Sequence, residues 1–136
     1  MTSNNSPKLQ YDKVYDYLLE IASNGCSASL VNIGDKAYRR QLNQQKIIVT
    51  YGDVLKKFEM IPNKIEHQQE LYPILDKINE DTFPILLSVL VVNGSDFIPS
   101  KPFFKKWLKM DDPTDKERVE AFKKELMKVR EHFCDE

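Results

Sequence analysis

One apolar run sets the narrowest limits on how this chain can fold. The run extends over residues 83–92, and Asn93-Gly94 follows it at once. It is about half as long as a membrane-spanning helix requires and is interrupted by a proline and a serine, so it predicts a buried strand over residues 85–92. Asn-Gly is a strong hairpin signal because both residues tolerate positive φ. The sequence therefore predicts a β-hairpin whose second strand contains residues 97–98.

A short strand and two helices are predicted immediately before this run. Residues 47–49 are apolar and β-branched, which predicts the strand. Thr50 and Asp53 then have the spacing of a capping box, in which the hydroxyl and the carboxylate each satisfy a backbone N–H group at the start of a helix. A second helix is predicted over residues 63–81 from its apolar stripe, with a kink or a restart at Pro73.

Two more helices are predicted on the N-terminal side of this region. Apolar residues at helical spacing over 14–22 predict an amphipathic helix that ends near Gly25. Asp35 can cap a short helix that reaches residue 42. Residues 26–34, which lie between these helices, could form either a loop or a short element.

The last part of the chain predicts a C-terminal amphipathic helix over residues 114–134. It opens with a second capping-box pattern, Thr114 with Glu117, and its apolar residues then recur every three or four positions. No internal repeat or linker divides the sequence. The chain is therefore predicted to be a single domain, residues 1–136, with a flexible segment at 1–6, a core at 47–100 and this C-terminal helix.

The order of these elements resembles a known family. Residues 49–54, Val-Thr-Tyr-Gly-Asp-Val, with the helix and the proline-led strand that follow, are similar to the DNA-binding domain of the alkylguanine alkyltransferases and the alkyltransferase-like proteins. The resemblance implies an α+β winged helix, here extended by the C-terminal helix. Where that family has its reactive Pro-Cys-His-Arg segment, this chain has Pro84-Ile85-Leu86-Leu87, and Glu66 falls near the position of the arginine that the family inserts into the duplex. Alkyl transfer is thereby excluded.

Side chains that could catalyse a reaction or hold a metal are sparse. His132 and Cys134 stand two positions apart with no further ligand nearby, which is not a zinc pattern. The sequence has no glycine-rich phosphate loop, and no cysteine with a base beside it in an ordered segment. We expect no enzymatic activity, no cofactor and no metal. Because the start of the chain does not resemble a signal peptide, Cys26 and Cys134 are predicted to be two unpaired thiols in a reducing cytoplasm.

Basic residues gather at two places, although the whole chain has a formal net charge of −1. One is the short helix after Asp35, and the other is residues 101–110, which hold four lysines, three aromatic residues and no acid. Lysines follow the backbone of single-stranded nucleic acid while aromatic rings stack on its bases. The predicted nucleic-acid-binding residues are Arg39, Arg40, Lys101, Lys105, Lys106, Lys109 and Trp107.

Both basic groups have a plainer interpretation. Arg39 and Arg40 could belong to a solvated helix face, as most charge runs do. Phe103, Phe104 and Trp107 could anchor a short helix in the core, because large aromatic residues after a hairpin are usually buried.

The helix that a winged helix would place in the major groove is acidic. Residues 63–81 hold two lysines against five acids, a net charge of −3. Two functions therefore stay open. One is a non-enzymatic accessory protein that contacts nucleic acid in DNA replication, in repair or in a mobile element. Single-stranded DNA is one candidate for the nucleic acid that it binds. The other is an adaptor that binds a DNA-handling protein through the winged helix and the C-terminal helix.

The composition indicates a cytoplasmic protein with no membrane contact and no small-molecule substrate. Its richness in asparagine and lysine suggests a bacterial or mobile-element source.

Overall fold

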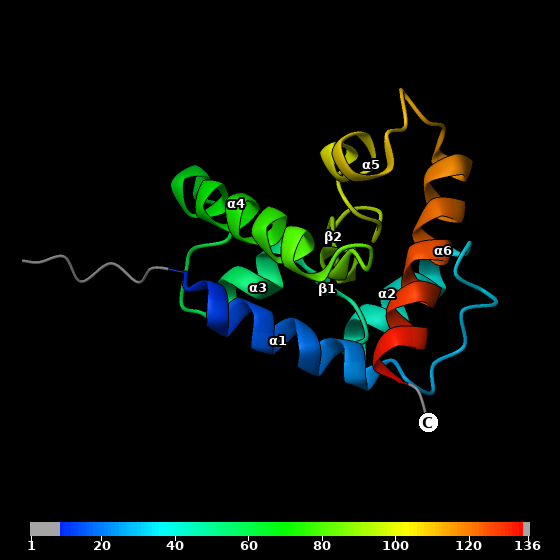
Figure 1. Cartoon of the computed structure of the whole chain (residues 1–136), viewed down its shortest axis with the longest axis horizontal. Coiled ribbons are helices and arrows are strands. Elements are labelled where there is room, and N and C mark those ends of the chain that lie inside the picture. The colour runs from blue at the N-terminus through cyan, green and yellow to red at the C-terminus, as the bar shows by residue number, and fades with distance from the viewer. Residues whose placement is uncertain (1–8, 135–136) are drawn as a thin grey trace, which may run out of the picture.

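The computed structural model of the chain describes residues 9–134. Two short strands lie in the middle of the molecule, and helices surround them (Figure 1). The predicted flexible segment at residues 1–6 lies outside the described residues. In chain order the elements are α1 Tyr11–Asn24, α2 Lys36–Gln44, β1 Val49–Thr50, α3 Tyr51–Lys57, α4 Ile65–Thr82, the 3-10 helix η1 Leu87–Leu90, β2 Val91–Val92, α5 Lys101–Leu108 and α6 Asp115–Phe133.

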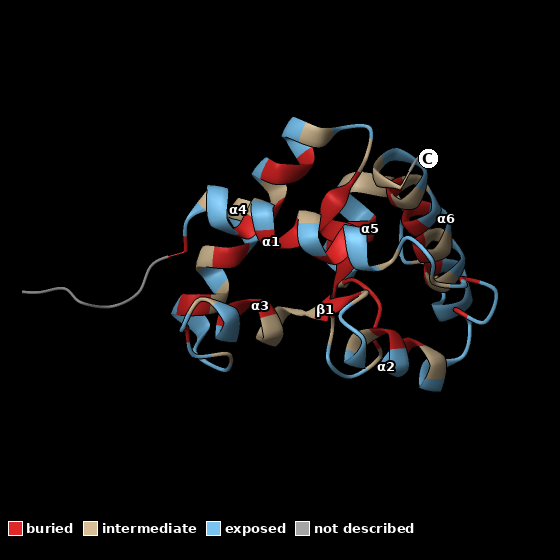
Figure 2. Ribbon diagram, turned by 90° about the horizontal axis from the view of Figure 1, so that it is seen from below, coloured by how far each residue is buried: buried red, intermediate tan, exposed pale blue. Residues whose placement is uncertain are grey.

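The short helix η1 occupies the centre of the core. All of its residues are buried, and it contacts α1, α4 and α6. In Figure 2 the buried residues follow the helix faces that meet in the middle of the molecule, while exposed residues cover the outside. The helices are therefore arranged around an apolar segment of the chain rather than against a broad sheet.

The predicted β-hairpin is wrong, although the fold is mixed helix and strand as expected. β1 and β2 pair in parallel, with Val49 opposite Val91 and Thr50 opposite Val92. The apolar run forms η1 before it reaches β2, because residues that are buried on every side have no alternation that would favour a long strand.

The chain turns at Asn93 without forming a second strand. The N–H of Asn93 donates to the carbonyl of Ile98 at 2.8 Å, and the N–H of Phe97 donates to the carbonyl of Asn93 at 2.9 Å. The positive φ falls on Phe97, at 58°, and not on Gly94. Asn93 and Gly94 therefore begin a loop that closes on itself, and the predicted strand at residues 97–98 is not formed.

Local cap signals correctly predicted three helix starts. The side chain of Asp35 caps α2. Thr50 and Asp53 form the capping box of α3, and Thr114 and Glu117 form that of α6. In each case the side chain satisfies a backbone N–H group that has no partner within the helix.

The other helices follow the predicted pattern with small differences. α1 contains the predicted stretch 14–22 and is followed by Gly25 at its C-cap. α4 begins at Ile65 and continues through Pro73 as one helix, so the predicted restart there is not found. Of the helices in residues 9–134, none has both the length and the apolar character needed to cross a membrane.

Cys26 and Cys134 form a disulfide bond, so the prediction of two unpaired thiols is wrong. Their Sγ atoms lie 2.00 Å apart, and their Cα atoms lie 5.3 Å apart. The bond joins the turn after α1 to the residue after α6, two helices that also contact each other and η1. The cysteines are distant in sequence, and only the packing of the two helices brings them together.

Candidate functional site

The predicted site around residues 101–109 forms α5 and the residue that ends it. Pro102 lies in the first turn of this helix, where its missing N–H has no partner to lose. Phe103 and Phe104 are both buried, and their rings meet edge to face with centroids 5.4 Å apart. These two rings therefore anchor α5 in the core and are not free to stack on bases.

The lysines of this segment remain at the surface. Lys101, Lys105 and Lys106 are exposed on α5, and Lys109 is exposed at its C-cap. Lys109 has a positive φ of 56°, which turns the chain away from the helix axis. Because the phenylalanines hold the inner face, the lysines are directed to solvent.

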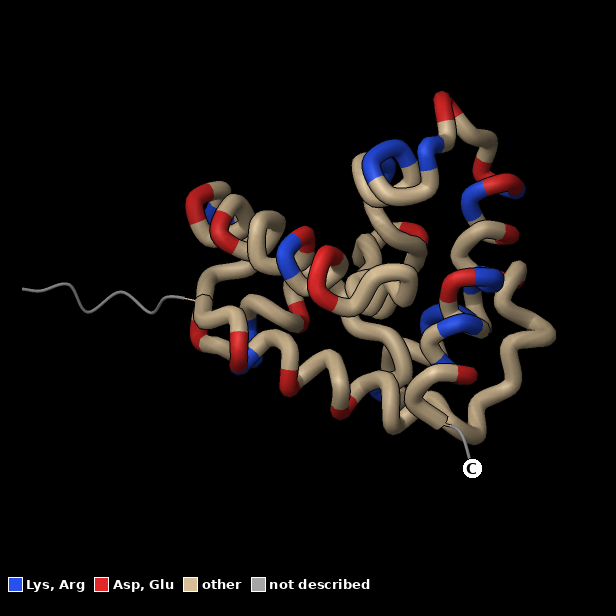
Figure 3. Tube along the Cα trace, in the orientation of Figure 1, with Lys and Arg blue, Asp and Glu red and all other residues tan. Residues whose placement is uncertain are grey.

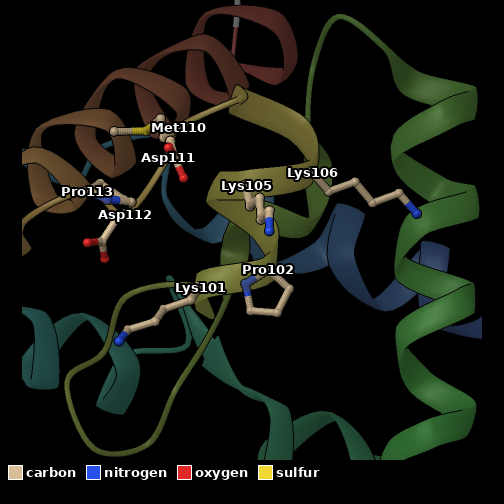
Figure 4. Close-up of a pocket in the computed structure, with 8 residues that line it drawn as sticks. All are labelled: Lys101, Pro102, Lys105, Lys106, Met110, Asp111, Asp112 and Pro113. Atoms are coloured by element: carbon tan, nitrogen blue, oxygen red, sulfur yellow. The ribbon is translucent and has the colours of Figure 1, made fainter.

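Three of these lysines line a hollow of about 690 Å³ between α5 and the linker to α6, which we call the lysine hollow. Its apolar surface comes from two prolines and a methionine, and two aspartates of the linker lie at its edge (Figure 4). The residues that line it are Lys101, Pro102, Lys105, Lys106, Met110, Asp111, Asp112 and Pro113.

Lys106 also reaches beyond this hollow. Its side chain extends toward α4 (Figure 4), where its Nζ lies 2.7 Å from Oδ2 of Asp76. This hydrogen bond, together with the charge of Asp76, raises the pKa of the Lys106 ammonium. The indole N–H of Trp107 donates to Oδ1 of the same carboxylate at 3.1 Å. Lys106 and Trp107 therefore join α5 to α4.

A second hollow, of about 320 Å³, lies on this α4 side of α5, and we call it the aromatic pocket. Four aromatic rings, contributed by α3, α4 and α5, are among the residues that line it. The residues that line it are Tyr51, Tyr72, Leu75, Asp76, Ser88, Ser100, Pro102, Phe103, Lys106 and Trp107. Sequence reasoning missed this pocket, because it depends on how α4 packs beside α5; an isolated tryptophan next to a lysine was its only signal.

Arg39 does not belong to the predicted patch. Its side chain is only 6% exposed, its Nε donates to the carbonyl of Asp96 at 3.0 Å, and one terminal nitrogen donates to the carbonyl of Ile33 at 3.0 Å. Burial lowers the pKa of its guanidinium, and the charges of Asp96 and Asp35 oppose that change. The prediction for Arg39 is wrong because its donors hold two loops together. Arg40, its neighbour on α2, is exposed.

The charges of the molecule are divided between its helices. α1 and α4 together contain eight acids and two lysines, whereas α5 contains three lysines and no acid. Figure 3 shows acidic positions recurring along α1 and α4 and basic positions grouped on α5. A polyanion that approaches this protein would therefore be attracted to α5 and repelled by α4.

One histidine and both cysteines are already bonded in the part of the chain that is described. Nδ1 of His67 accepts the N–H of Ile61 at 2.7 Å, and both cysteines are held in the disulfide. Across residues 9–134, no three side chains of the His, Cys, Asp and Glu types come together as metal ligands would.

Comparisons of the chain with protein-family models, with curated proteins and with solved structures found no match.

Proposed function

We propose that this protein binds the phosphate backbone of nucleic acid through the exposed lysines of α5, without catalysing a reaction. The observation that carries the proposal is that Lys101 and Lys105 are exposed at one hollow, with no acid on the same helix, whereas the ammonium of Lys106 is paired with Asp76. Lysines placed in this way displace the counterions of several adjacent phosphates, which favours binding without reference to base sequence.

The proposal does not require base stacking. Phe103 and Phe104 are buried, and the indole N–H of Trp107 is held by Asp76. Stacking platforms give proteins much of their affinity for single strands. Because Trp107, which is partly buried, is the one aromatic residue of α5 outside the core, α5 is not a platform of several stacking rings, and the proposal expects single-stranded and double-stranded DNA to bind with similar affinity.

The resemblance to the alkyltransferase DNA-binding domain supports this proposal only in the order of two helices, α3 and α4. They are a short capped helix and a longer helix in the order that a helix-turn-helix pair requires, while the hairpin wing is not formed. The acids of α4 disfavour its insertion into a groove, so α5 is the proposed contact.

Fluorescence anisotropy with labelled oligonucleotides, single-stranded and double-stranded and of equal length, tests the proposal at low and near-physiological salt. The variant Lys101→Glu/Lys105→Glu should lose most of the binding. In milder Lys→Ala variants, the slope of log affinity against log salt should fall by about 1 for each lysine removed.

The matched control is Lys56→Glu/Lys124→Glu, which changes the net charge by the same amount at exposed positions on α3 and α6. It should retain most of the affinity. Equal loss in the two double variants would show that only the net charge matters, and absence of binding by the wild type at both salt concentrations would contradict the proposal.

A protein adaptor is the second candidate, and the acidic surface of α1 and α4 favours it. With eight acids against two lysines, these helices would attract a basic partner and would repel the phosphates of a nucleic acid. This candidate predicts salt-sensitive binding to a basic protein that survives Lys101→Glu/Lys105→Glu. Isothermal titration calorimetry with that variant separates the two candidates.

A further inference from the structure

The aromatic pocket is built differently from the lysine hollow on the other side of α5. Tyr51 and Tyr72 face each other with ring centroids 5.7 Å apart and planes inclined at 60°, and Phe103 and Trp107 add two more rings to its lining. Asp76 is the one carboxylate among the lining residues, and Lys106 is the one base. Aromatic faces and a carboxylate around one hollow attract a cation.

The pocket already holds an ammonium group at its edge. Nζ of Lys106 lies 2.7 Å from Oδ2 of Asp76 and 5.7 Å from the centroid of the Trp107 ring. The indole N–H of Trp107 donates to the other oxygen of Asp76, so that the carboxylate and the ring are fixed relative to each other. The chain's own lysine therefore marks the position where a positive charge is stabilised.

This internal contact can be replaced by an external one. The side chain of Lys106 is 56% exposed and that of Asp76 is 36% exposed, so that water screens their attraction. Release of Lys106 would leave its ammonium hydrated, and the rest of the pocket could then take the aliphatic stem of a ligand beside Leu75 and Phe103.

The neighbouring groups favour a cation over an anion. An anion would have to displace Asp76 from Lys106 and then lie against the faces of tyrosine and tryptophan rings, which are electron-rich. The Tyr51 hydroxyl is neutral at physiological pH, and burial raises its pKa further, so Asp76 is the negative charge that a ligand meets in the pocket.

We propose that the aromatic pocket binds the ammonium group of a lysine side chain presented by a partner protein, in exchange for Lys106. The ammonium would take the place of the Lys106 Nζ at Asp76, and its stem would lie between Tyr51, Tyr72 and Trp107. Lys106 lines both hollows, but the phosphate contact proposed for α5 rests on Lys101 and Lys105, so either site can exist without the other.

Trp107 provides a direct measurement, because it is the single tryptophan of the chain. The full chain is titrated with N-acetyl-lysine methylamide while Trp107 fluorescence is recorded, and the shift of its indole N–H resonance is followed as a second readout. N-acetyl-norleucine methylamide has a similar stem without the charge and is the matched neutral probe. The lysine probe should give a saturable change that the neutral probe does not give.

Two variants make the exchange testable. In the wild type, the ammonium of Lys106 occupies the site for most of the time and so lowers the apparent affinity for the probe. Lys106→Met removes this competitor, so the lysine probe should bind at least about threefold more tightly. Asp76→Asn should abolish saturable binding. Glu66→Gln removes one negative charge from an exposed position of the same helix and should leave the affinity unchanged.

Three results would overturn the proposal. One is equal binding of the neutral probe, which would indicate an apolar pocket. Another is weaker binding to Lys106→Met, which would make Lys106 part of the site and not its competitor. The last is a wild type and a folded Lys106→Met variant that both give no saturable change. None of these results affects the nucleic-acid titration, whose variants alter Lys101 and Lys105 only.

Discussion

α2 and α5 are both short basic helices, yet they use their positive charges in opposite ways. On α2, Arg39 is buried and gives its donors to two backbone carbonyls. On α5, Lys101 and Lys105 remain exposed around the lysine hollow. One helix therefore uses one of its cations to hold the fold together, whereas two cations of the other remain at the surface.

The position of the apolar residues accounts for this difference. Arg39 lies three positions before the buried Leu42 and so shares its inward face. On α5 that inward face belongs to Phe103 and Phe104, which leaves the lysines outside. An arginine also suits burial better, because its guanidinium has five donors and is less strongly hydrated than an ammonium. A count of charges alone does not distinguish the two helices.

Loss of the disulfide should have the largest effect, because it tests the scaffold on which both helices rest. The bond spans a sequence separation of 108 residues. In the chain-entropy model, release of a loop of about 100 residues lowers the free energy of unfolding by about 4.7 kcal/mol. Urea denaturation of Cys26→Ala/Cys134→Ala beside the oxidised wild type measures this loss.

Neither α2 nor α5 contains a cysteine. Under conditions in which Cys26→Ala/Cys134→Ala is still folded, this variant should therefore keep the α5 surface unchanged. Its affinity for an oligonucleotide at low temperature should match that of the wild type. A loss of stability below about 1 kcal/mol would mean that the bond does not constrain the unfolded chain as this loop length requires.

Arg39→Ala tests the structural side of the comparison. The substitution leaves the carbonyls of Asp96 and Ile33 without their donor and opens a space beside α2. An orphaned buried group costs about 1–3 kcal/mol, so the free energy of unfolding should fall by about 3 kcal/mol. Arg40→Ala, at the exposed neighbouring position, should change it by less than about 0.5 kcal/mol in the same chemical denaturation experiment. Equal effects of the two variants would remove the distinction between them.

Asp53 is an acidic residue that, like Arg39, is held by hydrogen bonds within the fold. Burial alone would raise the pKa of its carboxyl, but hydrogen bonds from Asn43 and from the N–H of Thr50, together with the charge of Lys46, lower it below its ordinary value of 3.8. The stability that Asp53 contributes is therefore present above pH 3.8 and is lost as the pH falls through the lower folded-state pKa.

The variant Asp53→Asn should lower the free energy of unfolding by about 1 kcal/mol at neutral pH. Denaturation at a series of pH values should show this difference shrinking as the pH falls below 3.8. Glu117→Gln, in the more exposed capping box of α6, should have a smaller effect. A difference between wild type and Asp53→Asn that stays constant with pH would contradict the ionic role of Asp53.

The sequence predicted the parts of this fold that depend on neighbouring residues. Caps at Asp35, Thr50 and Thr114 and the amphipathic pattern of α1 are local signals, and they gave the correct helices. The exposure of the α5 lysines follows from the same kind of pattern, because Phe103 and Phe104 fix the inward face.

The remaining features depend on distant contacts. Val49 pairs with Val91 only after α3 and α4 have brought the two segments together, and Cys26 meets Cys134 only when α1 packs against α6. The burial of Arg39 requires the loop that ends near Asp96. No local periodicity encodes these pairings, and a fully buried apolar run gives no alternation from which strand and 3-10 helix could be told apart.

The last prediction concerns stability on α5, where the expected effect is the smallest. Lys101→Ala/Lys105→Ala removes two exposed side chains to which no ion pair is assigned among the described residues, so the free energy of unfolding should change by less than about 0.5 kcal/mol. The same variant should weaken oligonucleotide binding and reduce its salt dependence. Denaturation and anisotropy measured on one preparation separate these two effects. If the variant were instead destabilised as strongly as Arg39→Ala, the lysines of α5 would be structural as well, and the difference between the two helices would disappear.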